Sequence, residues 1–318
     1  MKVFFATDIH GSEKCYRKFL AAKRFYKADV AILGGDITGK IVVPIIQQPD
    51  GRQFKCTYLG RELKLKSKED VSRVEDSIRF NGYYPYQTTQ AEVEETRADK
   101  SKMNALFLRL MLERLEGWVR LADERAGSSD QKIYITGGND DPFEIEGILN
   151  KSSAVINPEG KIVQVGDNHE MISSGYSNIT PWKCPRDIAE EELEAKIGAM
   201  ISQVRDMKRC IFNLHVPPYG TIIDTAYEMK NQGDEVVPVM RDGRPQEIPV
   251  GSTSVRNAIE THQPLLGLHG HIHESRGVFK LGRTLCLNPG SEYSEGVLRG
   301  GLITIDDDKV VDYILTSG

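Results

Sequence analysis

The amino-acid sequence predicts an α/β fold with an open sheet, and features near its start indicate this. Val3 to Ala6 form a short apolar run of the kind found in buried strands. A polar tip with Asp8 and His10 follows, and after Gly11 the pattern becomes helical. In open α/β sheets the binding sites lie beyond the carboxyl ends of the strands, so we expect this tip to carry the chemistry.

The next segments complete a strand, helix, strand unit. Residues 12–26 have the apolar spacing of a helix, and Ser12 is suited to be its N-cap. Residues 28–33 are a second apolar strand, which ends at Gly35-Asp36. The second strand therefore also ends in a polar tip, as the first one does.

A long excursion over residues 41–125 precedes the third apolar strand. We expect there a strand over 41–46, a β-hairpin with strands over 55–59 and 62–65, a helix over 69–80 and one long helix over 89–126. The apolar stripe of the long helix favours packing on the sheet, and a dimer contact or a lid over the site are the alternatives. The lysines and arginines around the hairpin favour a solvated face.

The rest of the chain alternates strands and helices. We expect strands over 132–136, 162–165, 170–173, 210–214 and 264–268, helices over 189–204 and 253–261, a polar excursion over 222–250, and closing antiparallel strands over 278–281, 284–287, 302–305 and 310–315. Because no repeat or low-complexity linker divides the sequence, it favours one domain, residues 1–318, with insertions at about 41–125 and 222–250.

The composition is that of a globular protein, with 39% hydrophobic and 27% charged residues. No apolar run reaches the roughly 18 to 20 residues of a membrane helix. Asp8 and His10 interrupt the N-terminal apolar run, which argues against a signal peptide. We therefore expect a cytoplasmic protein with no membrane partner. The five scattered cysteines form no CxxC or CxxH pair, and the net charge of −5 disfavours a general nucleic-acid binder.

Polar residues of the metal-ligand type follow five of the predicted strands. In order they are Asp8-x-His10, Gly35-Asp36, Gly138-Asn139-Asp140, His215 and Gly270-His271-x-His273. Carboxylate, amide and imidazole groups suit divalent ions such as Mn²⁺, Fe²⁺ or Zn²⁺. One carboxylate can bridge two such ions about 3.5–4 Å apart, and the pair can then act on a phosphate. The sequence therefore predicts a metal centre.

This ordered set resembles the calcineurin-like metallophosphoesterases, whose pattern is D-x-H, G-D, G-N-H-D/E, H and G-H-x-H. The resemblance spans Asp8 to His273, and the segments at His215-Val-Pro-Pro and Asn288-Pro-Gly are similar to prokaryotic members. It implies a four-layer α/β/β/α sandwich of two mixed sheets, here with a largely helical insertion. The ligands that it implies are Asp8, His10, Asp36 and His273 for a first metal, and Asp36, Asn139, His215 and His271 for a second, with Asp36 bridging.

The implied activity is that of a dinuclear-metal phosphoesterase, which hydrolyses a small phosphomonoester or phosphodiester through a metal-bound hydroxide. Its cofactors would be two divalent ions, with Mn²⁺ favoured and Fe²⁺, Zn²⁺ or Ni²⁺ as the alternatives. A nuclease of the same superfamily and a non-enzymatic metal-binding scaffold are the competing functions. Nucleic acid is not the favoured partner, and a homo-oligomer is left open.

Two positions depart from the family pattern. The histidine that usually follows the asparagine is replaced by Asp140, with Asp141 next. Either Asp140 protonates the leaving group, its pKa raised by nearby carboxylates, or the leaving group needs little help; both aspartates could instead cap the following turn. An additional histidine, His269, precedes the last motif. We take Asp140, His269 and Asn139 as catalytic candidates, with burial in the core as the alternative for His269.

Overall fold

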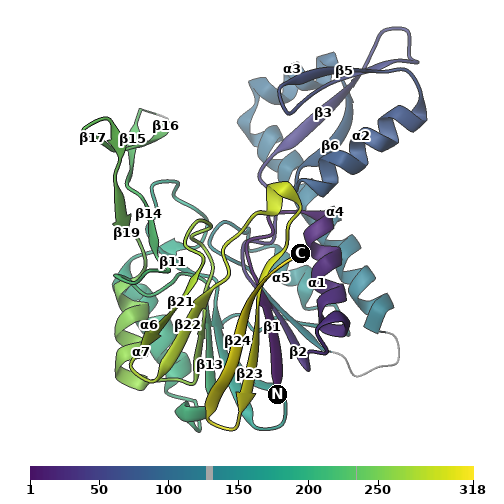
Figure 1. The fold of residues 1–318 in the computed structure, drawn as a ribbon. Coiled ribbons are helices and arrows are strands. Elements are labelled where there is room, and N and C mark those ends of the chain that lie inside the picture. The colour runs from purple at the N-terminus through teal and green to yellow at the C-terminus, as the bar shows by residue number, and fades with distance from the viewer. Residues whose placement is uncertain (127–131, 234) are drawn as a thin grey trace.

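Two six-stranded mixed sheets form the centre of the computed structural model, which describes residues 1–126, 132–233 and 235–318 (Figure 1). The first sheet contains, in spatial order, β24 (Lys309–Ser317), β23 (Arg299–Asp306), β1 (Lys2–Ala6), β2 (Val30–Gly34), β7 (Ile133–Thr136) and β8 (Val155–Ile156). The second contains β21 (Gly277–Leu281), β22 (Thr284–Asn288), β20 (Leu266–Leu268), β13 (Cys210–Leu214), β10 (His169–Ser174) and β9 (Ile162–Val165).

Helices cover the outer face of each sheet. The first sheet packs against α1 (Glu13–Phe25), α4 (Lys100–Ala126) and α5 (Ile145–Leu149), and the second packs against α6 (Glu190–Ile201) and α7 (Thr253–His262). Ser12 caps α1 and Ser252 caps α7, because each hydroxyl accepts a hydrogen bond from the first turn. The predicted four-layer α/β/β/α sandwich is confirmed.

The apolar run of β1 shows why its strand is buried on both faces. Val3 and Phe5 point into the core between the two sheets, and Phe4 and Ala6 point into the core beneath the helices. Side chains of a strand alternate between faces, so a central strand needs apolar residues at every position. β1, β2 and β7 run parallel, as do β10, β13, β20 and β22, so their carboxyl ends lie at one edge of the sandwich.

Residues 42–89 project beyond this edge and contain a sheet of their own, the insertion sheet (Figure 1). Its elements are β3 (Val42–Gln47), β4 (Phe54–Tyr58), β5 (Arg61–Leu65), α2 (Lys68–Phe80) and β6 (Tyr84–Thr89). The predicted hairpin is present as β4 and β5, but the pattern missed β6, which runs parallel to β3 at the sheet edge and contains Pro85. Proline is tolerated in an edge strand, because one side of such a strand needs no backbone N–H for the sheet.

The prediction of one long helix over 89–126 is wrong, because this segment forms two helices, α3 (Gln90–Ala98) and α4. Asp99 between them has an extended backbone, and its Oδ1 accepts hydrogen bonds from Ser101 N and Lys102 N. An aspartate in this role starts a new helix, and that local preference outweighs the continuous apolar stripe.

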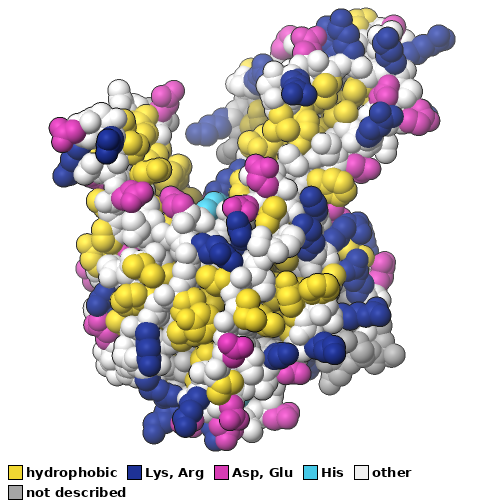
Figure 2. All heavy atoms as spheres, in the orientation of Figure 1, with side chains coloured by type: hydrophobic (Ala, Val, Ile, Leu, Met, Phe, Trp, Pro, Cys, Tyr) yellow, Lys and Arg dark blue, Asp and Glu magenta, His cyan; other side chains and the backbone are white. Residues whose placement is uncertain are grey.

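A second projection stands opposite the insertion sheet, and we call it the hairpin ladder. It consists of β14 (Thr225–Tyr227), β15 (Met229–Gln232), β16 (Glu235–Pro238), β17 (Met240–Arg241), β18 (Arg244–Pro245) and β19 (Glu247–Pro249). Figure 2 shows a hollow between the two projections with a histidine side chain at its base. The remaining short elements are β11 (Ser177–Asn178), β12 (Asp187–Ile188), η1 (Met207–Arg209) and η2 (Tyr293–Glu295).

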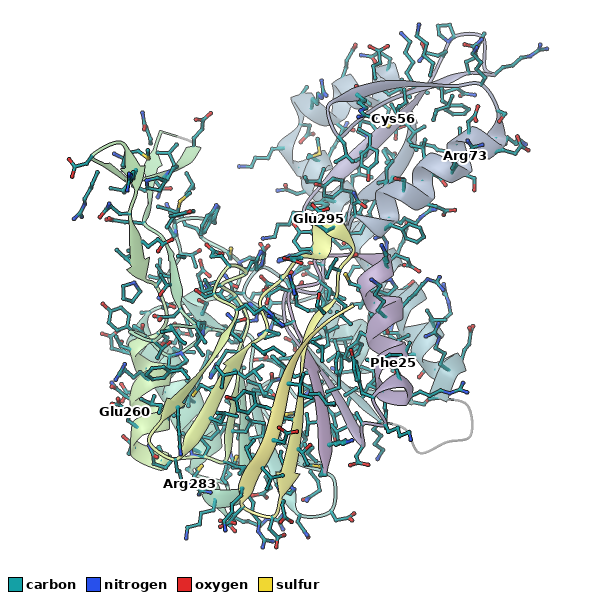
Figure 3. All side chains as sticks on the ribbon, in the orientation of Figure 1. Phe25, Cys56, Arg73, Glu260, Arg283 and Glu295 are labelled. Atoms are coloured by element: carbon teal, nitrogen blue, oxygen red, sulfur yellow. The ribbon has the colours of Figure 1, made fainter. Side chains whose placement is uncertain are left out.

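The labelled side chains of Figure 3 mark these regions, with Cys56 and Arg73 in the insertion and Glu295 at its foot on η2. Among the described residues, no helix is long and apolar enough to cross a membrane.

Candidate metal centre

The seven predicted ligands meet at the carboxyl edge of the two sheets. Each follows a strand: Asp8 and His10 follow β1, Asp36 follows β2, Asn139 follows β7, His215 follows β13, and His271 and His273 follow β20. Two groups of these side chains bring one ligand atom each to within 4.8 Å of one another, namely Asp8, His10, Asp36 and His273, and Asp36, His215 and His271. Asp36 belongs to both groups, as the bridging ligand would.

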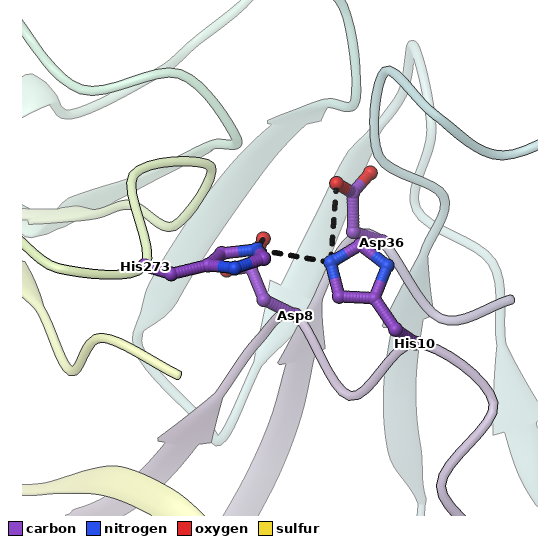
Figure 4. Close-up of side chains that lie close together, drawn as sticks. All are labelled: Asp8, His10, Asp36 and His273. Carbon is purple, nitrogen blue, oxygen red and sulfur yellow. Dashed lines mark hydrogen bonds and ion pairs between the residues drawn. The ribbon is translucent and has the colours of Figure 1, made fainter. Parts of the chain in front are cut away.

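The first group points its ligand atoms into one small space (Figure 4). His10 Nε2 lies 2.9 Å from His273 Nε2 and 3.8 Å from Asp36 Oδ2, and His273 Nε2 lies 3.4 Å from Asp8 Oδ1. Two imidazole nitrogens and two carboxylates facing each other at such distances are a ligand set for one divalent ion.

In the second group, hydrogen bonds outside the site orient the ligand atoms. His215 Nδ1 donates to the Gly34 carbonyl at 3.0 Å, which leaves Nε2 to face Asp36 Oδ1 at 3.4 Å. This Nε2 is buried and has no hydrogen-bond partner among the described residues. A buried ring nitrogen without a partner is costly, and a metal ion would satisfy it. The donor set thus fits a metal.

Asn139 completes the second group through its amide oxygen. Its Nδ2 donates to Asp187 Oδ1 at 2.9 Å, and its Oδ1 lies 2.9 Å from His271 Nδ1. Asp187 in turn accepts hydrogen bonds from Thr180 and Cys184, so its carboxylate is itself fixed. The amide is therefore oriented with its oxygen toward the ligand group, as a metal ligand requires.

The charges of the cluster hold both carboxylates ionised. Burial raises the pKa of Asp8, but the hydrogen bond with His273 and the charge of His215 outweigh it and lower the pKa to about 2. Asp36 likewise has a pKa well below its usual range, since His215 outweighs the effect of burial. Burial alone would lower the pKa of His215, but the charge of Asp36 raises it to about 9. Without a metal, His215 therefore carries the cation that balances Asp36.

The backbone at the ligands is strained. Asp8, His10, Asp36 and His271 have φ values of 52°, 37°, 48° and 68°. Such left-handed conformations cost roughly 1–3 kcal/mol per non-glycine residue and gather at functional sites. The loops also approach closely: a Cβ added at Gly138 would lie 2.1 Å from Asp36 Oδ1. Only glycine allows this approach.

Comparison with known proteins places the chain in a family. No family model matches it. It is 30% identical over 193 residues to the uncharacterized protein MJ1162 of Methanocaldococcus jannaschii, and the match covers 59% of this chain and 78% of that protein. The two proteins belong to one family. MJ1162 is itself described only as uncharacterized, so membership of the MJ1162 family does not indicate which activity this chain has.

Solved structures share the fold of this MJ1162 family member. The crystal structure of TT1561 from Thermus thermophilus has a TM-score of 0.54 and 14% identity, and the match covers 100% of this chain and 97% of that one. A second crystal structure has a TM-score of 0.56 and 15% identity, with 99% and 98% covered. At such identities the likeness concerns the fold alone.

Asp140 stands where the metallophosphoesterase pattern has a histidine, and Asp141, the residue after it, has a structural place. It is buried, and its carboxylate accepts hydrogen bonds from the backbone N–H groups of Ile37, Thr38 and Gly138 at 2.8–3.0 Å. It therefore ties the loop after β2 to the loop after β7. Asp140 instead lies beside the ligands, and its N–H donates to Asp36 Oδ1 at 3.1 Å. Burial and the charge of Asp36 raise the pKa of Asp140.

His269 lies outside both ligand groups. Its ring is fully buried, and Nδ1 contacts the carbonyl oxygens of Leu214 at 2.8 Å and Val216 at 3.2 Å. Strand alternation places it on the same face of the sheet as Gly267 and Cys286, toward the helices. These contacts favour the alternative of a buried structural histidine for His269, and a catalytic role for it stays a prediction.

Two residues support the site in this MJ1162 family member through contacts that the sequence does not predict. Arg186 is fully buried, and its side chain donates to the carbonyl oxygen of Asp141 at 3.2 Å and pairs with Glu146 at 2.8 Å. Asn288 accepts the Gly290 N–H as a turn residue does, but its Nδ2 also donates to three carbonyls, among them that of Gly270. Such contacts depend on packing between distant segments.

Proposed function

We propose that this protein is a dinuclear-metal-dependent phosphoesterase that hydrolyses a small phosphomonoester or phosphodiester. The observation that carries the proposal is the pair of ligand groups that share Asp36 at the carboxyl edge of the sheets. Two divalent ions held there would supply Lewis-acid stabilisation of charge on a phosphate and would lower the pKa of a water molecule. The order of the motifs along the sequence supports the same reaction class.

Different residues of the chain would bind each of the two ions. Asp36 would bridge them, Asp8, His10 and His273 would complete the first site, and Asn139 with the two other histidines would complete the second. The hollow above the ligands opens to solvent between the projections, which supports a small substrate that enters from that side (Figure 2). Mn²⁺ is the favoured ion, with Fe²⁺, Zn²⁺ or Ni²⁺ as alternatives, because the donor set holds oxygen and imidazole ligands without a thiolate.

The test is metal-dependent release of p-nitrophenol from p-nitrophenyl phosphate and from bis-p-nitrophenyl phosphate. We expect activity with Mn²⁺. Asp36→Asn should abolish this activity, because it removes the negative charge that both ligand groups share, and it should bind fewer than two ions. Asp312→Asn on the exposed edge strand β24 is the matched control and should behave as the unaltered protein. Absence of turnover with all four ions, on both substrates, would contradict the proposal.

A nuclease of the same superfamily is the second candidate, because six basic side chains are exposed on or beside the insertion sheet. They are Arg52, Lys55, Arg61, Lys64, Lys66 and Lys68. Binding to DNA that weakens steeply with added salt would favour this function. The net charge of −5 speaks against it. A metal-binding scaffold without activity would show two bound ions and no turnover, so a metal count beside the assay separates it from both enzymes.

A further inference from the structure

Asp140 lies beside the predicted ligand Asp36, and a cation accompanies its carboxylate. Asp140 directly follows the predicted ligand Asn139, so an isolated negative charge there would repel a phosphate ester. Lys40 Nζ lies 2.6 Å from Asp140 Oδ2. Lys40 comes from the loop after β2, four residues beyond Asp36, so the ion pair joins two ligand loops. It is close enough for its charge to act on Asp36 and His10 as well.

Buried groups fix the backbone that leads to Lys40. The N–H groups of Ile37 and Thr38 donate to the Asp141 carboxylate at 3.0 and 2.8 Å, and the N–H of Gly39 donates to the Tyr84 hydroxyl at 2.8 Å. A Cβ at Gly39 would lie 2.1 Å from the Gly82 carbonyl, which leaves this turn no room to shift. These three successive residues fix the backbone directly before Lys40. Catalysis at a charged centre requires groups that are preorganised in this way.

Of the two side chains in this ion pair, that of Lys40 is the more exposed. The Lys40 side chain is 47% exposed, whereas the Asp140 side chain is 27% exposed. The lysine is therefore the more accessible partner of the pair. A surface ion pair with no other task would have no reason to stand between two ligand loops with an anchored backbone.

We propose that Lys40 is a catalytic residue that contacts the phosphate ester as a fixed cation, with Asp140 as its positioning residue; this rests on the proposed phosphoesterase function. In the reaction, the oxygen of a water molecule forms a bond to phosphorus and the water releases one proton to solvent, while the bond from phosphorus to the ester oxygen breaks. The electron pair leaves with the ester oxygen, whose negative charge Lys40 offsets. That oxygen then takes a proton from solvent. Lys40 thus stabilises the leaving-group oxygen in place of the histidine that the metallophosphoesterase pattern has at position 140.

The experiment compares metal-loaded Lys40→Met and Lys40→Arg on leaving groups of different quality. We expect Lys40→Met to lose about tenfold in kcat with p-nitrophenyl phosphate and about 10²- to 10³-fold with phenyl phosphate, because the poorer leaving group carries more charge in the transition state. Lys40→Arg should restore most of the rate, since it keeps the charge. Asp140→Asn should lose less than Lys40→Met and in the same direction. Both Lys40 variants should retain two ions.

Lys102→Met is the matched control, because Lys102 is an exposed lysine that also pairs with a carboxylate, that of Glu95. It should leave both rates unchanged. An equal loss on both substrates in Lys40→Met, or no loss on either, would overturn the role of Lys40 and leave the proposed function intact.

A binding measurement separates the two proposals if the unaltered protein shows no turnover. Inorganic phosphate should bind the metal-loaded protein at least tenfold more weakly in Lys40→Met than in the unaltered chain or in Lys102→Met. A protein without turnover refutes the phosphoesterase function, and unchanged phosphate affinity in Lys40→Met then refutes the lysine as a phosphate contact as well.

Discussion

Replacing Gly138 by alanine tests whether the metal centre depends on the close approach of its loops. The added Cβ would lie 2.1 Å from Asp36 Oδ1, whereas ordinary contact begins at 3.4 Å. The carboxylate or the loop must therefore move by roughly 1.3 Å, the difference between these distances. The loop is not free to retreat, because Gly138 N donates to Asp141, which also holds Ile37.

A shift of this size exceeds the roughly 0.5 Å within which a functional group has to be held. Because Asp36 belongs to both ligand groups, both sites should lose affinity together. We expect a loss of at least about 10²-fold in kcat/KM and a fall in the free energy of unfolding of about 1–3 kcal/mol. Titration calorimetry with Mn²⁺ measures the affinity, the p-nitrophenyl phosphate assay measures turnover, and chemical denaturation measures stability.

Gly198→Ala is the matched control for this substitution. Gly198 lies in the interior of α6, and an added Cβ there meets nothing within 4 Å. It should leave metal binding unchanged and stabilise the protein by about 0.5–1 kcal/mol, since alanine favours the helix. A folded Gly138→Ala variant that binds two ions as tightly as the unaltered chain, with undiminished turnover, would refute the argument from loop approach.

Two further predictions concern the second ligand group. Asp187→Ala frees the Asn139 amide to rotate, so metal affinity at the second site should fall about 10- to 100-fold while the first site stays filled. At a Mn²⁺ concentration that just fills both sites of the unaltered protein, a variant that still binds two ions would contradict this. Metal affinity should also rise with pH up to about 9 and then level off, because His215 is protonated below that pKa and must release its proton to bind an ion. Calorimetry at pH values from well below to just above this pKa measures the slope, and an affinity independent of pH would show that His215 is not a ligand.

The ligand positions could be found from the sequence because each stands at a point where an apolar strand ends. Asp8, Asp36 and His215 all follow four or more buried residues, and the parallel order of the strands brings such ends to one edge. The four-layer arrangement came from the resemblance, since periodicity alone does not say how many sheets there are. The helix break at Asp99 was not predicted, because one capping residue there outweighs a long apolar stripe.

The residues around the ligands could not be found in this way, because their partners are far apart in the sequence. Asp187 orients Asn139 across 48 residues, and Lys40 meets Asp140 where Asp141 joins their two loops. Asp141 also compensates for strain: its carboxylate accepts N–H groups that the left-handed turn at Asp36 directs inward. Asp141, for which the sequence offered a role as a turn cap, is therefore a main reason why Asp36 can belong to both ligand groups.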